Sequence, residues 1–68
     1  MHISYNIFWK RLNEKNMSTA DLSRQTGISL STMSKISRNE NVSLSVLGRI
    51  CSALDLKMSD FIDIKHKQ

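Results

Sequence analysis

The sequence predicts an all-α fold, and three observations support this prediction. At three places a serine follows one apolar residue and precedes another by four positions, an arrangement that caps and staples the N-terminus of a helix. The chain contains no proline and only two glycines, a composition that favours helices. Alternation of apolar and polar residues, which is typical of strands, is confined to the two ends.

The length of 68 residues corresponds to one small domain, residues 1–68. A chain this short hides only about 60% of the surface of its unfolded state, so its stability is marginal and dimerisation would raise it. The hydrophobic content of 40% is enough for one compact core and too high for a disordered chain.

The first elements are a short extended segment and a helix. Residues 3–5 alternate between apolar and polar side chains, which indicates a weak strand. A helix is predicted from residue 6 or 7 to residue 16, with Phe8 and Leu12 on its apolar face. We expect Trp9 to join the core; the alternative is that its ring edge lies beside the backbone of a ligand.

Residues 18–38 organise the chain, because they predict two short helices joined by a tight turn. The helices span about residues 19–26 and 30–38. Gly27 suits the position after the first helix, since glycine adopts a left-handed backbone without a Cβ penalty. The small Ser23 would let the two helices approach closely. This spacing describes a helix-turn-helix, but also an αα-hairpin inside any small helical protein.

The repeated serines place the helix starts. Ser18 is the predicted N-cap of the first helix of the pair, and Asp21 completes a capping box with it. Ser29 caps the second helix of the pair. Ser43 caps a later helix over about residues 44–55, whose apolar residues recur at helical spacing.

The last residues predict a short turn and a second extended segment. Ser59 is expected to cap a final turn through Asp60 and Phe61. Ile62 and Ile64 alternate with a polar residue, so this segment could pair as a strand with residues 3–5 and tie the two ends together.

Positive charge is concentrated in the first half of the chain. The whole chain has a net charge of +4, and residues 1–38 carry six basic and two acidic side chains. Residues 39–64 carry two basic and four acidic side chains. A basic first part of the chain followed by an acidic part is typical of a protein with one surface that binds a polyanion. Basic side chains on a small protein are also common as an ordinary solvated surface.

These elements resemble the phage-repressor and Cro class of helix-turn-helix domains, also called the xenobiotic-response-element family, and in particular its small stand-alone bacterial members. The resemblance covers about residues 3–64 and is carried by three phrases: SYNIFWKRL, GISLSTMSKISRNENVSL and ICSALD. It implies a compact five-helix DNA-binding domain that acts as a homodimer. The helix over residues 30–38 would enter the major groove, and the helix over residues 19–26 would cross the phosphate backbone. The implied function is a sequence-specific transcriptional regulator, a repressor that reads a palindromic operator in double-stranded DNA.

The surface that would read DNA follows from the apolar face of the helix over residues 30–38. If Met33 and Ile36 face the core, four side chains point toward bases: Leu30, Ser31, Ser34 and Lys35. Lysine can donate to guanine, serine tolerates several bases and leucine can contact a thymine methyl group. Members of the class often carry proline where this chain has Leu30, and many use glutamine or asparagine as base readers. The resemblance therefore carries over the fold and leaves the operator sequence open.

Phosphate contacts are predicted at both ends of the helix pair and on the preceding helix. The N-terminus of the helix over residues 19–26 offers free N–H groups and a positive dipole end. The predicted phosphate contacts are Ser18, Thr19, Ser29, Arg11, Lys10, Arg24, Arg38, Asn39 and Asn41. For each of them the alternative is an ordinary solvated side chain.

Other functions find little support in the sequence. His2 and His66 lie at the ends and Cys51 lies on an apolar face, while acid pairs, metal-ligand spacings and glycine-rich phosphate loops are absent, so we expect no enzyme, cofactor or metal. Apolar runs are too short to cross a membrane, and no signal-peptide pattern is present. The single cysteine agrees with a reducing cytoplasm. We therefore expect a cytoplasmic protein, which would be nucleoid-associated if it binds DNA. The sequence shows no ligand-sensing domain, so we expect no small-molecule ligand.

The alternative function is a protein-interaction or antitoxin-like module of the same fold, with secondary affinity for DNA. Phe61, Ile62 and Ile64 could form its partner surface, and could equally close the core or a homodimer.

Overall fold

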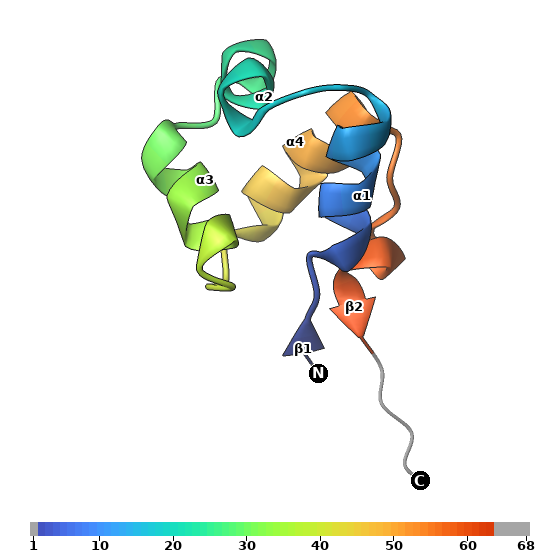
Figure 1. The fold of residues 1–68 in the computed structure, drawn as a ribbon. Coiled ribbons are helices and arrows are strands. Elements are labelled where there is room, and N and C mark those ends of the chain that lie inside the picture. Colours follow the sequence, from blue (N-terminus) through green and yellow to red (C-terminus); the bar gives the residue numbers. More distant parts are fainter. Residues whose placement is uncertain (1, 64–68) are drawn as a thin grey trace, which may run out of the picture.

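Four α-helices, one 3₁₀-helix and two short strands make up residues 2–63, the part of the chain that this computed structural model describes (Figure 1). In chain order they are β1 (His2–Ile3), α1 (Asn6–Glu14), α2 (Thr19–Thr26), α3 (Leu30–Ser37), α4 (Leu44–Leu54), η1 (Met58–Phe61) and β2 (Ile62–Asp63). The predicted all-α fold is confirmed, and the 3₁₀-helix η1 takes the place of the fifth helix. Within the described residues, no helix is long and apolar enough to cross a membrane.

The three predicted serine caps are present. The Ser18 hydroxyl accepts the backbone N–H of Asp21 at 3.1 Å, and the Asp21 carboxylate accepts the N–H of Ser18 at 3.0 Å, which completes the capping box. Ser29 and Ser43 accept the N–H groups three residues further on, at 3.2 and 3.1 Å. Each cap satisfies a donor that the helix itself leaves free, so local sequence is sufficient to start these helices.

The Ser18 cap gives a test of this local control. Replacing Ser18 with alanine is expected to cost about 1 kcal/mol and to lower Tm by about 4–8 °C, because the Asp21 N–H loses its acceptor. Circular dichroism during heating measures the change. Ser45→Ala is the matched control, since Ser45 is an exposed serine inside α4 that caps no helix. Equal melting temperatures for the two variants would contradict the assignment.

Each α-helix is followed by a residue with a left-handed backbone. These residues, with φ between 54° and 79°, are Asn16, Gly27, Asn39 and Asp55. Sequence reasoning found only the glycine, and it extended the other three helices by one or two residues: α1 ends at Glu14 rather than residue 16, α3 at Ser37 rather than 38 and α4 at Leu54 rather than 55. Asparagine and aspartate tolerate this conformation better than other residues with a Cβ, which is the signal that could have placed the ends.

All four α-helices and η1 contribute to one hydrophobic core. Its largest fully buried side chains are Phe8, Phe61, Leu22, Met33, Ile36, Ile50 and Leu54. Phe61 therefore closes the core, which is one of the three roles that the sequence left open for it. The prediction that Trp9 lies in the core is wrong: its side chain is 37% exposed and only packs edge-on against Phe8, because it lies on the flank of α1 beyond the residues that face α4 and η1.

The two ends of the described chain pair as an antiparallel two-stranded sheet. Ile3 lies opposite Ile62, and the Ser4 N–H donates to the Phe61 carbonyl at 2.7 Å. The predicted pairing of the two ends is thus present, but the first strand covers residues 2–3 rather than 3–5, because α1 begins directly after Tyr5. Ile64, which was also predicted to pair, lies outside the described residues. The prediction that Ser59 caps the last turn is wrong, since the Asp60 carboxylate accepts the N–H of Lys57, one residue before η1.

Candidate nucleic-acid interface

The turn between α2 and α3 is held by side chains of α2. The Ser23 hydroxyl donates to the Ile28 carbonyl at 2.5 Å, and the Ile28 N–H donates to the Thr26 hydroxyl at 3.2 Å. Gly27 has φ 79°, and Ile28 is buried in the core. Both polar backbone groups of Ile28 are therefore paired and its apolar side chain is buried, which holds the angle at which α3 leaves α2.

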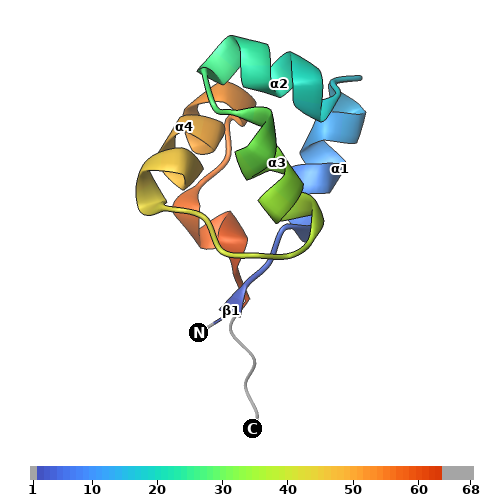
Figure 2. The same ribbon diagram turned by 90° about the vertical axis from the view of Figure 1, so that its left-hand side faces the viewer.

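Helix α3 presents one face to the core and the opposite face to solvent. Met33 and Ile36 are 2% and 0% exposed, as predicted, whereas Leu30 is 57% exposed. Ser31, Ser34 and Lys35 are also exposed on α3, as is Ser29, the residue that caps the helix. In Figure 2, the ribbon of α3 lies on the side of the molecule that faces the viewer. We call Leu30, Ser31, Ser34 and Lys35 the α3 surface.

Hydroxyl groups gather at the N-terminus of α3. The Ser29 hydroxyl lies 3.0 Å from both the Ser31 and the Thr32 hydroxyls, in addition to capping the helix. Ser29 is thus largely occupied within the helix, while Ser31 can still turn a donor or acceptor outward. Thr32 was missed by sequence reasoning, although its position next to the cap could have suggested it.

The N-terminus of α2 already holds a carboxylate. Asp21 accepts the Ser18 N–H, and hydrogen bonds from the Ser18 backbone and side chain hold the pKa of its carboxyl below the usual value. Arg24 forms an exposed ion pair with the same carboxylate. The negative charge of Asp21 at this helix end would therefore repel a phosphate that approaches Ser18 or the half-buried Thr19.

Arg11 has a different setting from the other predicted phosphate contacts. Its guanidinium donates to the backbone carbonyls of Leu54 and Asp55 at 2.5 and 3.0 Å, and it lies 3.3 Å from the Glu14 carboxylate. These carbonyls are among the acceptors that the end of α4 leaves free. The arrangement gives Arg11 a structural role, and a phosphate contact would require these bonds to break. Lys10, its neighbour, is exposed on α1.

The segment after α3 brings the remaining predicted contacts to one end of that helix. Asn39 is the left-handed residue that lets Glu40 donate its N–H back to the Lys35 carbonyl at 2.8 Å. Arg38 and Asn41 flank this turn and are exposed. These three candidates thus follow the end of α3 in the chain, at the turn that the Glu40 N–H closes onto Lys35, and we call them the phosphate-binding edge predicted for this helix.

Two residues near this edge escaped sequence reasoning. Tyr5 is 3% exposed, and its hydroxyl donates to the Glu40 carbonyl at 2.7 Å across 35 residues of chain. Burial raises the pKa of the Tyr5 hydroxyl. The Glu40 carboxylate accepts a hydrogen bond from Arg38 Nε at 2.7 Å. Glu40 lies two positions after Arg38 in the sequence, which was a readable signal, whereas nothing local to Tyr5 indicates its partner.

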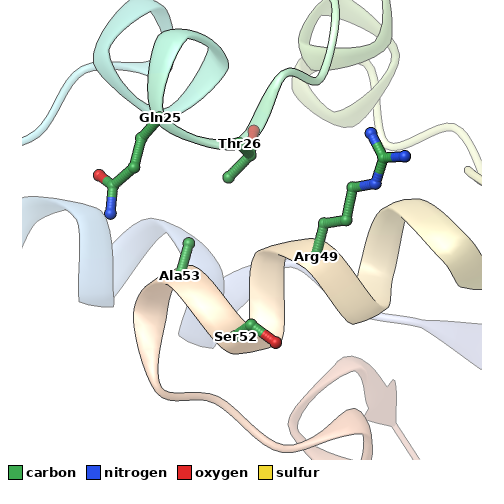
Figure 3. A pocket seen from close by; sticks show the side chains of 5 residues that line it. All are labelled: Gln25, Thr26, Arg49, Ser52 and Ala53. Carbon is green, nitrogen blue, oxygen red and sulfur yellow. The ribbon is translucent and has the colours of Figure 1, made fainter.

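A shallow open pocket lies away from the α3 surface, where the end of α2 meets α4. Its volume is about 330 Å³, and it is lined by Gln25, Thr26, Arg49, Ser52 and Ala53 (Figure 3). Arg49 and Gln25 extend along its two sides, and Ala53 lies between them. None of the residues predicted to contact DNA lines this depression.

Comparison with known proteins agrees with this geometry. A family model described as the Cro/C1-type HTH DNA-binding domain matches residues 8–67. A solved structure, the crystal structure of the transcriptional regulator VanUg in form II, matches with a TM-score of 0.79 and 42% sequence identity over 91% of this chain and 83% of that chain. No curated protein matches. The matched family is one of DNA-binding domains and not of enzymes, and the chain belongs to it: the Cro/C1-type helix-turn-helix DNA-binding domains.

Proposed function

We propose that this protein is a transcriptional regulator that binds a specific site in double-stranded DNA, with α3 in the major groove. The observation that carries the proposal is the division of α3 into a buried face, held by Met33 and Ile36, and an open face that ends in Lys35. The family assignment and the similarity to a transcriptional regulator support the same function.

The α3 surface offers few strong base readers. Lys35 can donate to O6 and N7 of guanine, Ser31 and Ser34 can donate or accept, and Leu30 can contact a thymine methyl group. A surface dominated by serine gives weak direct readout, so we expect the shape of the DNA to supply part of the specificity. Arg38, Asn39 and Asn41 would fix the position of the helix on the backbone.

We further propose that the protein is a cytoplasmic, nucleoid-associated repressor that binds a palindromic operator as a homodimer. Two α3 helices related by a twofold axis would lie about 34 Å apart, one turn of DNA. Because Phe61 is buried, the apolar dimer surface predicted at the C-terminal end retains Ile62, which is 38% exposed. Sedimentation tests the homodimer: a protein that remains a monomer both at high concentration and on DNA would exclude it.

Lys35→Ala tests the role of the α3 surface. The variant is expected to weaken binding to the operator by about 1–3 kcal/mol and binding to random DNA much less, because it removes a contact to a base edge. Lys57→Ala is the matched control: Lys57 lies in the segment between α4 and η1, on the side of the molecule away from α3 (Figure 1). Gel shifts on both DNAs measure the losses, and equal losses for Lys35→Ala on operator and random DNA would count against base readout.

Selection of genomic fragments bound by the protein tests the function as a whole. It is expected to return one sequence class with twofold symmetry, located near the regulated genes. A salt titration of the gel shift then separates specific from non-specific binding. If no fragment is enriched and duplex DNA binds only weakly, the antitoxin-like interaction module becomes the better description.

A further inference from the structure

The strongest unexplained feature of the predicted DNA-binding edge is an acidic side chain. Arg38 Nε lies 2.7 Å from the Glu40 carboxylate, and both side chains are about half exposed. The hydrogen bond from Arg38 holds the pKa of Glu40 below its usual value, and the charges of Arg38 and Lys35 lower it further. Glu40 is therefore an ionised carboxylate beside two cations of the predicted interface.

The backbone holds this carboxylate in place. The Glu40 N–H donates to the Lys35 carbonyl at 2.8 Å, and its own carbonyl accepts the hydroxyl of the buried Tyr5 at 2.7 Å. Both polar backbone groups of residue 40 are thus bonded, one to α3 and the other to a core residue. Its side chain cannot move far from the end of α3 unless these bonds break.

We propose that Glu40 is an internal competitor for DNA phosphate, and that it limits the affinity of the α3 surface for duplex DNA. While Arg38 is paired with Glu40, its charge is compensated within the protein, and the carboxylate repels a phosphate that approaches. An ion pair this exposed is weak, so a phosphate in the correct position can replace the carboxylate. The inference rests on the proposed function.

The Glu40 carboxylate would change the balance between specific binding to an operator and non-specific binding to random DNA. Phosphate contacts supply essentially all of the affinity for random DNA. Because serine-rich readout is weak, an unrestrained set of cations would hold the protein on any sequence. A fixed carboxylate at this edge lowers that sequence-independent contribution.

Glu40→Gln tests the proposal, since it removes the charge and leaves both backbone bonds. We expect affinity for a random duplex to rise about fivefold to tenfold at 0.1 M salt, and the slope of log K against log salt to steepen by about 0.9, as for one additional phosphate contact. Glu14→Gln is the matched control: it makes the same change of net charge and also breaks an ion pair with an arginine, Arg11, whose guanidinium is bound to the end of α4. It should leave affinity and slope nearly unchanged.

A second pair of variants tests whether Glu40 acts through Arg38. In an Arg38→Ala background, Glu40→Gln should lose most of its effect, because the cation that it releases is absent. Circular dichroism melts establish that each variant folds. An unchanged affinity and slope for Glu40→Gln, an equal gain for Glu14→Gln, or weaker binding by Glu40→Gln would each overturn the inference. Failure of the unaltered protein to bind any duplex at low salt would instead overturn the proposed function.

Discussion

Replacing Ile36 with alanine is expected to lower the free energy of unfolding by about 2–5 kcal/mol, because the side chain is fully buried and its removal leaves a cavity between α3 and the core. A domain of this size has only about 3–10 kcal/mol of stability, so the loss is a large fraction of the total. Urea denaturation followed by circular dichroism measures the loss.

Leu30→Ala is the control on the same helix. Leu30 is 57% exposed, so its truncation removes little buried surface, and we expect a change in stability within about 0.5 kcal/mol. The same variant should weaken operator binding if Leu30 contacts a thymine methyl group. Similar stability losses for Ile36→Ala and Leu30→Ala would mean that the buried and open faces of α3 have been assigned wrongly.

Replacing Arg11 with alanine is expected to lower the free energy of unfolding by about 1–3 kcal/mol, since the carbonyls of Leu54 and Asp55 lose a charged donor. The slope of DNA affinity against salt should stay the same, because a guanidinium bound to the end of α4 is not free to neutralise a phosphate. Thermal unfolding and a salt titration of DNA binding measure the two effects.

Arg24→Ala provides the comparison for Arg11. Arg24 is 73% exposed, and among the residues that the structure describes it pairs with Asp21 of its own helix, so its removal should cost no more than about 1 kcal/mol. If Arg11→Ala proves as stable as the unaltered protein and reduces the salt slope by about one unit, Arg11 contacts phosphate and the structural role is wrong.

Local chemistry accounts for what could be predicted from the sequence. A cap such as Ser18 bonds to a backbone group only three residues away, so neighbouring residues are enough to place a helix start. The orientation of α3 was predictable for the same reason, because helical spacing alone puts Met33 and Ile36 on one face and Lys35 on another. Asn39 shows the limit of this reasoning: its left-handed backbone lies just after the end of α3, although helical spacing alone extends the helix to residue 38.

The sequence by itself determined where α2, α3 and α4 begin and which face of α3 is open, since both follow from contacts within about one turn of helix. Only the tertiary structure decided what Arg11 does, because its carbonyl partners lie 43 and 44 residues away. The same holds for the contact between Tyr5 and Glu40, which spans 35 residues. No periodicity encodes such pairs: they form because packing of α1 against α4 and η1 brings together groups that the helices leave unsatisfied.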